Sequence, residues 1–304
     1  MNETRQSLVS VIMPVFNAGE FLVDAVRSIL NQTYKNIELI IVDDASTDGS
    51  WQTISSFKKR HPTIIRSIRL KKQMNKGGDA CANIGFLKAR GTYVARMDAD
   101  DIAHPDKLEK QVVYMETHPE VLLLGTQARV INREGEVIGE KHVPVTHQSI
   151  YESYFVFHPI IHPTVMIRRE KLTKRRTLYK IKYSANNDLY TFFELLRIGK
   201  FANLPEALLD YRVHGKNDSL TKPKERFFNT LSIRLHALSD GYVPTLKGVL
   251  CTVAQTLVIA LLPERLIVPL YLYMKGILKL SDQPGRLSFL PVLTRIKTYV
   301  YSLV

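Results

Sequence analysis

The first hundred residues alternate between apolar, β-prone runs and segments with a helical pattern of apolar positions. The first two runs are apolar on both faces, as in strands buried within a sheet. Strands are expected over residues 8–16, 36–42, 64–70 and 92–97, and helices over residues 20–32, 51–60 and 79–89. This alternation predicts an α/β fold with a mostly parallel sheet and helices on both faces.

Polar segments directly follow three of the expected strands. They are residues 14–17, 43–48 and 98–101. The carboxyl ends of parallel strands lie at one edge of a sheet, and ligands bind in the crevice outside that edge. Acidic loops unrelated to function would be divided between both edges, so the pattern predicts a binding site.

The most acidic of these segments contains Asp98, Asp100 and Asp101. Asp98 and Asp100 can point to the same side of an extended backbone, and hard divalent cations prefer carboxylate oxygens. An EF-hand would need a polar ligand at position 102, which is Ile102. The alternative interpretation is that one of these residues caps the helix whose first turn holds Pro105.

The net charge of +13 indicates an anionic partner, such as nucleic acid, anionic lipid or a phosphorylated substrate, although a solvated basic surface also accounts for it. Residues 14–19 lack the glycine pattern of a dinucleotide-binding turn, and no Walker A loop occurs. Cys81 and Cys251 match no metal spacing and suit a reducing compartment. The first residues do not have the pattern of a signal peptide.

Several segments, in their order along the chain, resemble the signature of family 2 glycosyltransferases with the GT-A fold. The later ones are residues 157–166, 199–205 and 211–214, so the resemblance covers about residues 8–220. The first ones are Ser10-Val11-Ile12-Met13-Pro14-Val15-Phe16-Asn17, Val42-Asp43-Asp44-Ala45-Ser46-Thr47-Asp48-Gly49-Ser50 and Met97-Asp98-Ala99-Asp100-Asp101.

The resemblance implies a site for a nucleotide-sugar. Asp44 would accept a hydrogen bond from a uracil ring, and Asp98 would lie by the ribose and the water shell of a metal. In the helix after the glycine turn, Ala82 stands where relatives often carry arginine, and Lys76 or Arg96 could supply that cation. The implied nucleotide-side residues are Pro14, Val15, Asn17, Asp43, Asp44, Lys76 and Asp98.

The resemblance also implies a metal and a catalytic base. Asp100 would bind Mg²⁺ or Mn²⁺, with His214 as a further metal ligand or a donor to the diphosphate. An ordinary surface histidine is the alternative for His214. Arg212 and His162 would contact the diphosphate or the acceptor. Asp188 would be the base, or else the N-cap of a helix over residues 189–197.

One position of the implied base motif departs from the family pattern. Relatives often carry a Glu-Asp pair, whereas this chain has Asn187 before Asp188. The acceptor side is expected to contain short strands at residues 121–125 and 128–131 and a hairpin turn at 133–136. The basic run 171–182 is either a solvated loop or a contact for a phosphate-bearing acceptor.

The composition changes beyond residue 220. An amphipathic helix is expected at 222–239, followed by apolar runs at 247–262 and 266–274 that are shorter than a membrane span. Basic residues interleave with aromatic ones further on, which suits an anionic membrane surface. Packing on the catalytic domain or on a partner is the alternative. The expected division is a catalytic domain 1–225, with nucleotide and acceptor halves 1–118 and 119–225, and a C-terminal extension 226–304.

With these features, the resemblance implies an inverting, metal-dependent glycosyltransferase of the bacterial surface-polysaccharide type. It would move a hexose from a UDP-sugar to a hydroxyl of a lipid-linked saccharide. The expected location is the cytoplasm, at the inner face of the cell membrane through the C-terminal helices. A nucleotidyltransferase and a basic nucleic-acid-binding protein are the alternatives. No nucleic-acid partner is expected, because three carboxylates repel phosphate unless a metal is present.

Overall fold

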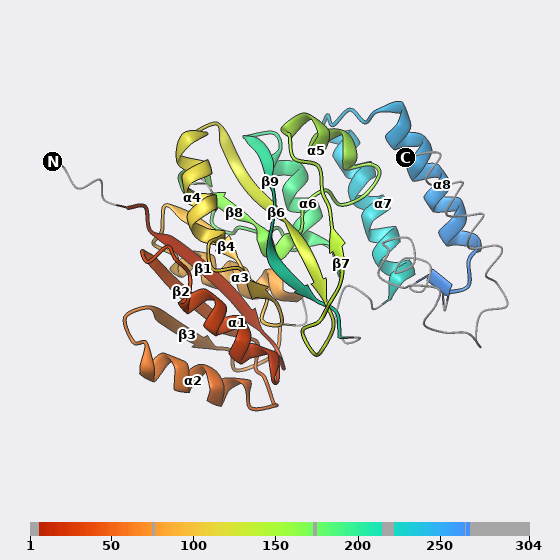
Figure 1. Ribbon diagram of the computed structural model, residues 1–304. Coiled ribbons are helices and arrows are strands. Elements are labelled where there is room, and N and C mark those ends of the chain that lie inside the picture. The colour runs from red at the N-terminus through yellow and green to blue at the C-terminus, as the bar shows by residue number, and fades with distance from the viewer. Residues whose placement is uncertain (1–5, 75–76, 173–174, 215–221, 265, 268–304) are drawn as a thin grey trace.

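The computed structural model describes residues 6–74, 77–172, 175–214, 222–264, 266 and 267 (Figure 1). Nine strands form one sheet in the order β3-β2-β1-β4-β8-β6-β9-β5, and β7 pairs with β6. The strands are β1 (Val9–Val15), β2 (Ile37–Asp43), β3 (Ile65–Arg69), β4 (Tyr93–Arg96), β5 (Ile102–Ala103), β6 (Val121–Ile131), β7 (Val137–Lys141), β8 (Met166–Arg168) and β9 (Lys200–Arg212).

Helices flank this sheet. They are α1 (Phe21–Leu30), α2 (Ser50–Arg60), α3 (Gly77–Lys88), α4 (Lys107–Thr117), α5 (His147–Ser153), α6 (Asn187–Leu195), α7 (Pro223–Ser239) and α8 (Leu246–Leu261), with 3₁₀ turns η1 (His162–Thr164) and η2 (Arg169–Leu172). The four strands and three helices expected in the first hundred residues are confirmed within a few positions. The expected α/β fold, with a mostly parallel first half of the sheet and helices on both faces, is confirmed as well.

The first four strands are parallel neighbours, so their carboxyl ends lie at one edge. Val15 pairs with Asp43 across β1 and β2, and Ile12 pairs with Arg96 across β1 and β4. The polar segments that follow β1, β2 and β4 therefore begin side by side. The sequence-based expectation of one shared edge is confirmed.

The second half of the sheet differs from the expectation in one respect. Instead of two short strands, β6 is a single strand of 11 residues. Thr126 and Gln127, at the junction of the two expected strands, are polar but buried. The Gln127 side chain donates to the backbone oxygens of Val143 (3.2 Å) and Leu204 (3.0 Å), which satisfies the buried amide. The expected turn after β6 is present, with Gly135 at φ +93°.

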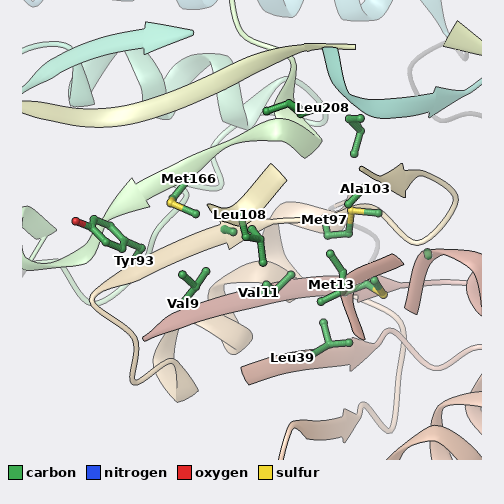
Figure 2. Packing of buried hydrophobic residues seen from close by; sticks show 14 of the residues in the cluster. Val9, Val11, Met13, Leu39, Tyr93, Met97, Ala103, Leu108, Met166 and Leu208 are labelled. Atoms are coloured by element: carbon green, nitrogen blue, oxygen red, sulfur yellow. The ribbon is translucent and has the colours of Figure 1, made fainter. Parts of the chain in front are cut away.

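Each face of the sheet carries its own core. Alternate side chains of β1 point to opposite faces, with Val9, Val11 and Met13 in one cluster and Ile12 in the other. Figure 2 shows Val11 and Met13 close to Leu39 of the neighbouring strand β2, with Val9 further along β1. Helices α1, α2 and α4 cover the first face, and α3, α5, α6 and α7 contribute to the second. The sheet runs through both expected halves of the catalytic domain.

The C-terminal helices pack on the catalytic domain. The buried Arg234 of α7 donates to the backbone oxygen of Tyr154 (3.0 Å) and to Thr252 Oγ1 of α8 (3.2 Å). Because α7 begins at Pro223, the expected boundary after residue 225 falls inside this helix. Within the part of the chain that the structure describes, no helix has the length and apolarity needed to cross a membrane.

Candidate active site

The acidic cluster follows β4 and divides into three different environments. Asp98 pairs with Arg96, whose Nε and Nη2 lie 3.0 and 2.8 Å from Asp98 Oδ1. Nη1 of Arg96 donates to the backbone oxygen of Gly78 at 3.3 Å, at the start of α3. The Arg96 guanidinium therefore links the end of β4 to the glycine turn, where a cation was expected.

Asp100 faces His214, which follows the end of β9. The His214 Nε2 lies 3.0 Å from Asp100 Oδ2, and the imidazole stacks on Phe21 at 4.8 Å. Burial and the neighbouring charge of Asp98 raise the pKa of Asp100, although His214 partly opposes this. A nearby cation would favour the charged carboxylate, so this pair is chemically suited to a divalent metal.

The described residues supply only part of a metal shell in this region. Among the residues described, no group of three or more His, Cys, Asp or Glu side chains is arranged to hold a metal ion. Mg²⁺ commonly binds through one or two carboxylates together with substrate phosphates. Asp100 and His214 fit that incomplete type of site.

Asp101 and Arg212 hold the loop in place. Asp101 is buried and accepts the backbone N–H of Arg212 at 2.9 Å. The Arg212 guanidinium donates to backbone oxygens of Asp100 (2.9 Å), Asn132 (3.3 Å) and Arg133 (2.8 Å). Only 3% of Arg212 is exposed, and these contacts give it a structural role in holding the loop. Its contact with the diphosphate or the acceptor stays a prediction.

The alternative role of the acidic cluster as a helix cap is wrong. Helix α4 begins at Lys107, and Asp106 occupies its N-cap position. Asp98, Asp100 and Asp101 therefore precede the helix by several residues. The three carboxylates are available for the contacts described above.

The loop after β2 lies against the loop after β1. The backbone N–H of Asp44 donates to the oxygen of Val15 (2.8 Å), and Asp44 Oδ1 accepts the N–H of Met74 (2.9 Å). Asn17, at φ +48°, accepts the N–H of Thr47 (2.8 Å) through its side chain. Pro14, Val15 and Asp43 are buried beneath these loops. Lys76 lies outside the described residues.

Asp188 lies inside the first turn of α6, whose N-cap is Asn186. The alternative N-cap role of Asp188 is therefore wrong. Asp188 Oδ2 is 3.2 Å from His158 Nε2 and 3.7 Å from His162 Nδ1. Burial opposes ionisation, but the adjacent histidines outweigh it and the pKa of Asp188 lies below its usual value. Asp188 is consequently a carboxylate at neutral pH.

The two histidines next to Asp188 are held in defined orientations. His158 Nδ1 accepts the backbone N–H of Ile160 (3.3 Å), which leaves the ring proton on Nε2, facing Asp188. Nε2 of His162 lies 2.7 Å from the hydroxyl of Tyr179. Burial lowers the pKa of His162 to about 4, so this ring is neutral near pH 7. His162 thus lies beside the candidate base.

The sequence-based reasoning missed three residues around Asp188. They are Asp79, His158 and Tyr179. His158 belongs to a segment already noted for its resemblance, but Asp79 looks like an ordinary acid in the first turn of a helix. No local pattern shows that it comes close to α6.

Asn187 has a structural role. Its Oδ1 accepts the backbone N–H groups of Lys182 and Tyr183, both at 2.9 Å, and its Nδ2 donates to the Tyr183 oxygen. The loop before α6 is thereby fixed to the helix that carries Asp188. A glutamate in place of Asn187 could not donate to that oxygen.

The basic run before α6 is partly paired. Arg175 and Lys180 both contact Glu194 on α6. A pocket of about 400 Å³ adjoins this run, and its lining residues are Asn83, Thr177, Tyr179, Lys180, Ile181, Lys182 and Tyr190. It opens next to the helix that carries Asp188.

Comparison with known proteins identifies relatives of this chain. Residues 10–180 match the model for glycosyl transferase family 2. The putative glycosyltransferase EpsE of Bacillus subtilis is 35% identical over 220 residues, which is 70% of this chain and 75% of EpsE. The O-antigen biosynthesis glycosyltransferase WbnJ of Escherichia coli is 31% identical over 212 residues, which is 69% of this chain and 81% of WbnJ.

Solved structures show the same fold at lower identity. The S. aureus TarS complex with UDP-GlcNAc has a TM-score of 0.60 and 17% identity, covering 75% of this chain and 64% of that one. The mannosyltransferase PcManGT from Pyrobaculum calidifontis, in complex with GDP-Man and Mn²⁺, also has a TM-score of 0.60 and 17% identity, covering 98% and 81%. The chain matches 39% of a longer TarS chain. From the match over residues 10–180 and these relatives, the chain belongs to glycosyl transferase family 2 and is a glycosyltransferase with the GT-A fold.

Proposed function

We propose that this glycosyltransferase is inverting and metal-dependent, and that it uses a UDP-sugar as donor. The main support for this proposal is that two acidic centres lie apart from each other at one edge of the sheet. Asp100 pairs with His214 at the end of β9, whereas Asp188 lies with His158 and His162 at the start of α6. One centre suits a diphosphate with its metal, and the other suits a base.

Asp188 would take the proton of the acceptor hydroxyl as that oxygen attacks the anomeric carbon. His158 Nε2 and His162 Nδ1 lie 3.2 and 3.7 Å from the Asp188 carboxylate and favour its ionised form. A divalent ion, when bound, would neutralise charge on the leaving diphosphate. Asp100 and His214 are the residues that would hold it.

The choice of uridine rests on the loop after β2. Asp44 is buried beside Val15. A carboxylate in this position can accept a hydrogen bond from a ring N–H of the base. The TarS structure with UDP-GlcNAc supports a uridine nucleotide, and the PcManGT structure with GDP-Man and Mn²⁺ supports the metal. Both are properties of those proteins, so they support the proposal by analogy.

A thermal-shift panel tests the donor class. UDP-glucose, UDP-galactose, UDP-GlcNAc and GDP-mannose are added with and without Mn²⁺. At ligand concentrations about 100 times Kd, binding adds about 2.7 kcal/mol to the free energy of unfolding. We expect stabilisation by a UDP-sugar that depends on Mn²⁺. Indifference to every nucleotide-sugar would reject the proposal.

The acceptor is proposed to be a lipid-linked saccharide in surface-polysaccharide assembly. WbnJ, a relative named for O-antigen biosynthesis, supports this class of product. Helix α8 supports a membrane location because polar side chains of this helix face the protein and apolar side chains face outward. Thr252 and Gln255 face the protein and donate to the backbone oxygens of Phe155 and Val156, both at 2.7 Å. The exposed large apolar side chains of α8 are Leu246, Val249, Leu250, Val253, Leu257, Val258 and Leu261.

The outward face of α8 gives a test of this location. The double substitution Leu250→Glu and Leu257→Glu places two charges on a face that would contact lipid, so we expect most co-sedimentation with phosphatidylglycerol vesicles to be lost. Leu87→Glu on α3 is the matched control, since Leu87 is similarly exposed, at 64% against 59% for Leu257. Equal sedimentation of both variants would exclude α8 as the attachment surface.

A further inference from the structure

A second carboxyl group lies beside the candidate base. Asp79 is in the first turn of α3, and its side chain is only 13% exposed. His162 contacts both acids through opposite ring nitrogens, with Nε2 at 3.8 Å from Asp79 Oδ1 and Nδ1 at 3.7 Å from Asp188 Oδ2. Asp79 therefore belongs to the same cluster as Asp188, although it comes from the other half of the domain.

Asp79 is also connected to the nucleotide side. The preceding residue, Gly78, accepts a hydrogen bond from Arg96 (3.3 Å), and Arg96 holds Asp98. A Cβ atom at Gly78 would lie 2.6 Å from Arg96 Nη2, so this contact is close-packed. A continuous series of contacts thus runs from Asp98 through Arg96 and the Gly78–Asp79 turn to His162 and Asp188.

The Asp79 carboxyl group has hydrogen-bonding capacity left. The backbone N–H of Asp188 is directed at it. Within the described part of the chain, no side chain forms a hydrogen bond to Asp79, although a carboxyl group offers about four acceptor positions. Buried polar groups are normally satisfied, and the small exposed fraction leaves room for a ligand to reach this one.

The protonation state of Asp79 points to a neutral ligand. Burial and the charge of Asp188 raise the pKa of Asp79 to about 8, while Arg96 opposes the shift. At pH 7 the group is therefore mostly a neutral acid, which can donate one hydrogen bond and accept others. Hydroxyl groups have the same dual character.

The location then identifies the ligand, on the basis of the proposed function. The reacting anomeric carbon has to lie between the diphosphate and the base, and Asp79 lies between Asp98 and Asp188 in the series of contacts. We propose that Asp79 binds hydroxyl groups of the donor sugar and is a specificity-determining residue of this enzyme. A purely structural role, as a cap for α6, is the competing explanation.

Binding measurements separate these roles. Affinities for UDP and for the tightest-binding UDP-sugar of the panel are measured by calorimetry with Mn²⁺. In Asp79→Ala we expect the affinity for UDP to be unchanged and that for the UDP-sugar to fall by about 10- to 100-fold. Asp79→Asn, which can still donate and accept, should recover part of the loss and serves if the alanine variant does not fold.

The matched control is Asp240→Asn at the end of α7, which pairs with His236 at 3.8 Å and should keep the wild-type ratio of the two affinities. An unchanged ratio in both Asp79 variants would overturn the inference, whatever happens to turnover. Failure of the wild-type protein to bind any nucleotide-sugar would instead reject the proposed function. The two failures are therefore distinguishable.

Discussion

Asp188→Asn should lower kcat for sugar transfer by about 10²- to 10⁴-fold, the usual contribution of a positioned general base. The amide keeps the shape of the side chain but cannot take a proton from the acceptor hydroxyl. His158 Nε2, now 3.2 Å from the Asp188 carboxylate, would still have an oxygen to face. Donor binding should be retained, because Asp188 lies with His158 and His162 rather than with Asp100 and His214.

Steady-state transfer from the UDP-sugar selected by the panel measures this effect, together with calorimetric affinity for the same donor. Asp240→Asn at the end of α7 is the control, because Asp240 is a partly exposed carboxylate that pairs with His236 at 3.8 Å. Transfer within threefold of wild type in Asp188→Asn would show that another group takes the proton. Asp79 would then be the first candidate, since it contacts the same imidazole.

The parts of the site that follow strands were predictable from the sequence. A run of apolar residues followed by acids implies a strand with a polar end, and parallel strands bring such ends together. The register Val15–Asp43 confirms that arrangement. The prediction depended on local patterns and on one general rule of topology, so it did not require knowledge of any particular side-chain contact.

Contacts between distant segments could not be predicted in this way. The resemblance implied a diphosphate or acceptor contact for Arg212, but it did not show that the Arg212 guanidinium donates to the backbone oxygens of Asp100, Asn132 and Arg133. Asp79 looked like a helix-terminal acid, and its approach to Asp188 depends on how α3 and α6 pack. The sequence around Arg212 and the sequence around Asp79 contain no pattern that would predict these contacts.

Asn187 shows how the two kinds of information combine. From the sequence, the missing acid next to Asp188 left the base without a neighbouring negative charge. In the structure a carboxyl group reaches that neighbourhood from α3, and the electrostatic influence is mutual, because the charge of Asp188 contributes to the raised pKa of Asp79. Asn187 instead holds residues Lys182 and Tyr183. The charge arrangement around Asp188 is thus a property of the fold.

Asp100→Ala should abolish the Mn²⁺-dependent part of nucleotide-sugar binding and lower kcat/KM by about 10²- to 10³-fold, as expected when one electrostatic contact to a leaving group is lost. The substitution removes the only carboxylate that His214 Nε2 contacts among the described residues. It also relieves the repulsion from Asp98 that raises the pKa of Asp100, so the apo protein should not lose stability.

The readout is the increase in melting temperature caused by Mn²⁺ together with UDP, compared with UDP alone. Asp106→Asn is the matched control, since Asp106 follows the same loop but pairs with Lys110 at 2.9 Å. If Asp100→Ala kept the full Mn²⁺-dependent shift, the metal would lie elsewhere and the Asp100–His214 pair would be structural. Loss of the shift in Asp100→Ala, with retention in Asp106→Asn, would locate the metal and the diphosphate at the end of β4. Arg96 contacts the carboxylate of Asp98, and the backbone N–H of Arg212 donates to that of Asp101. The carboxylate of Asp100 contacts His214 instead.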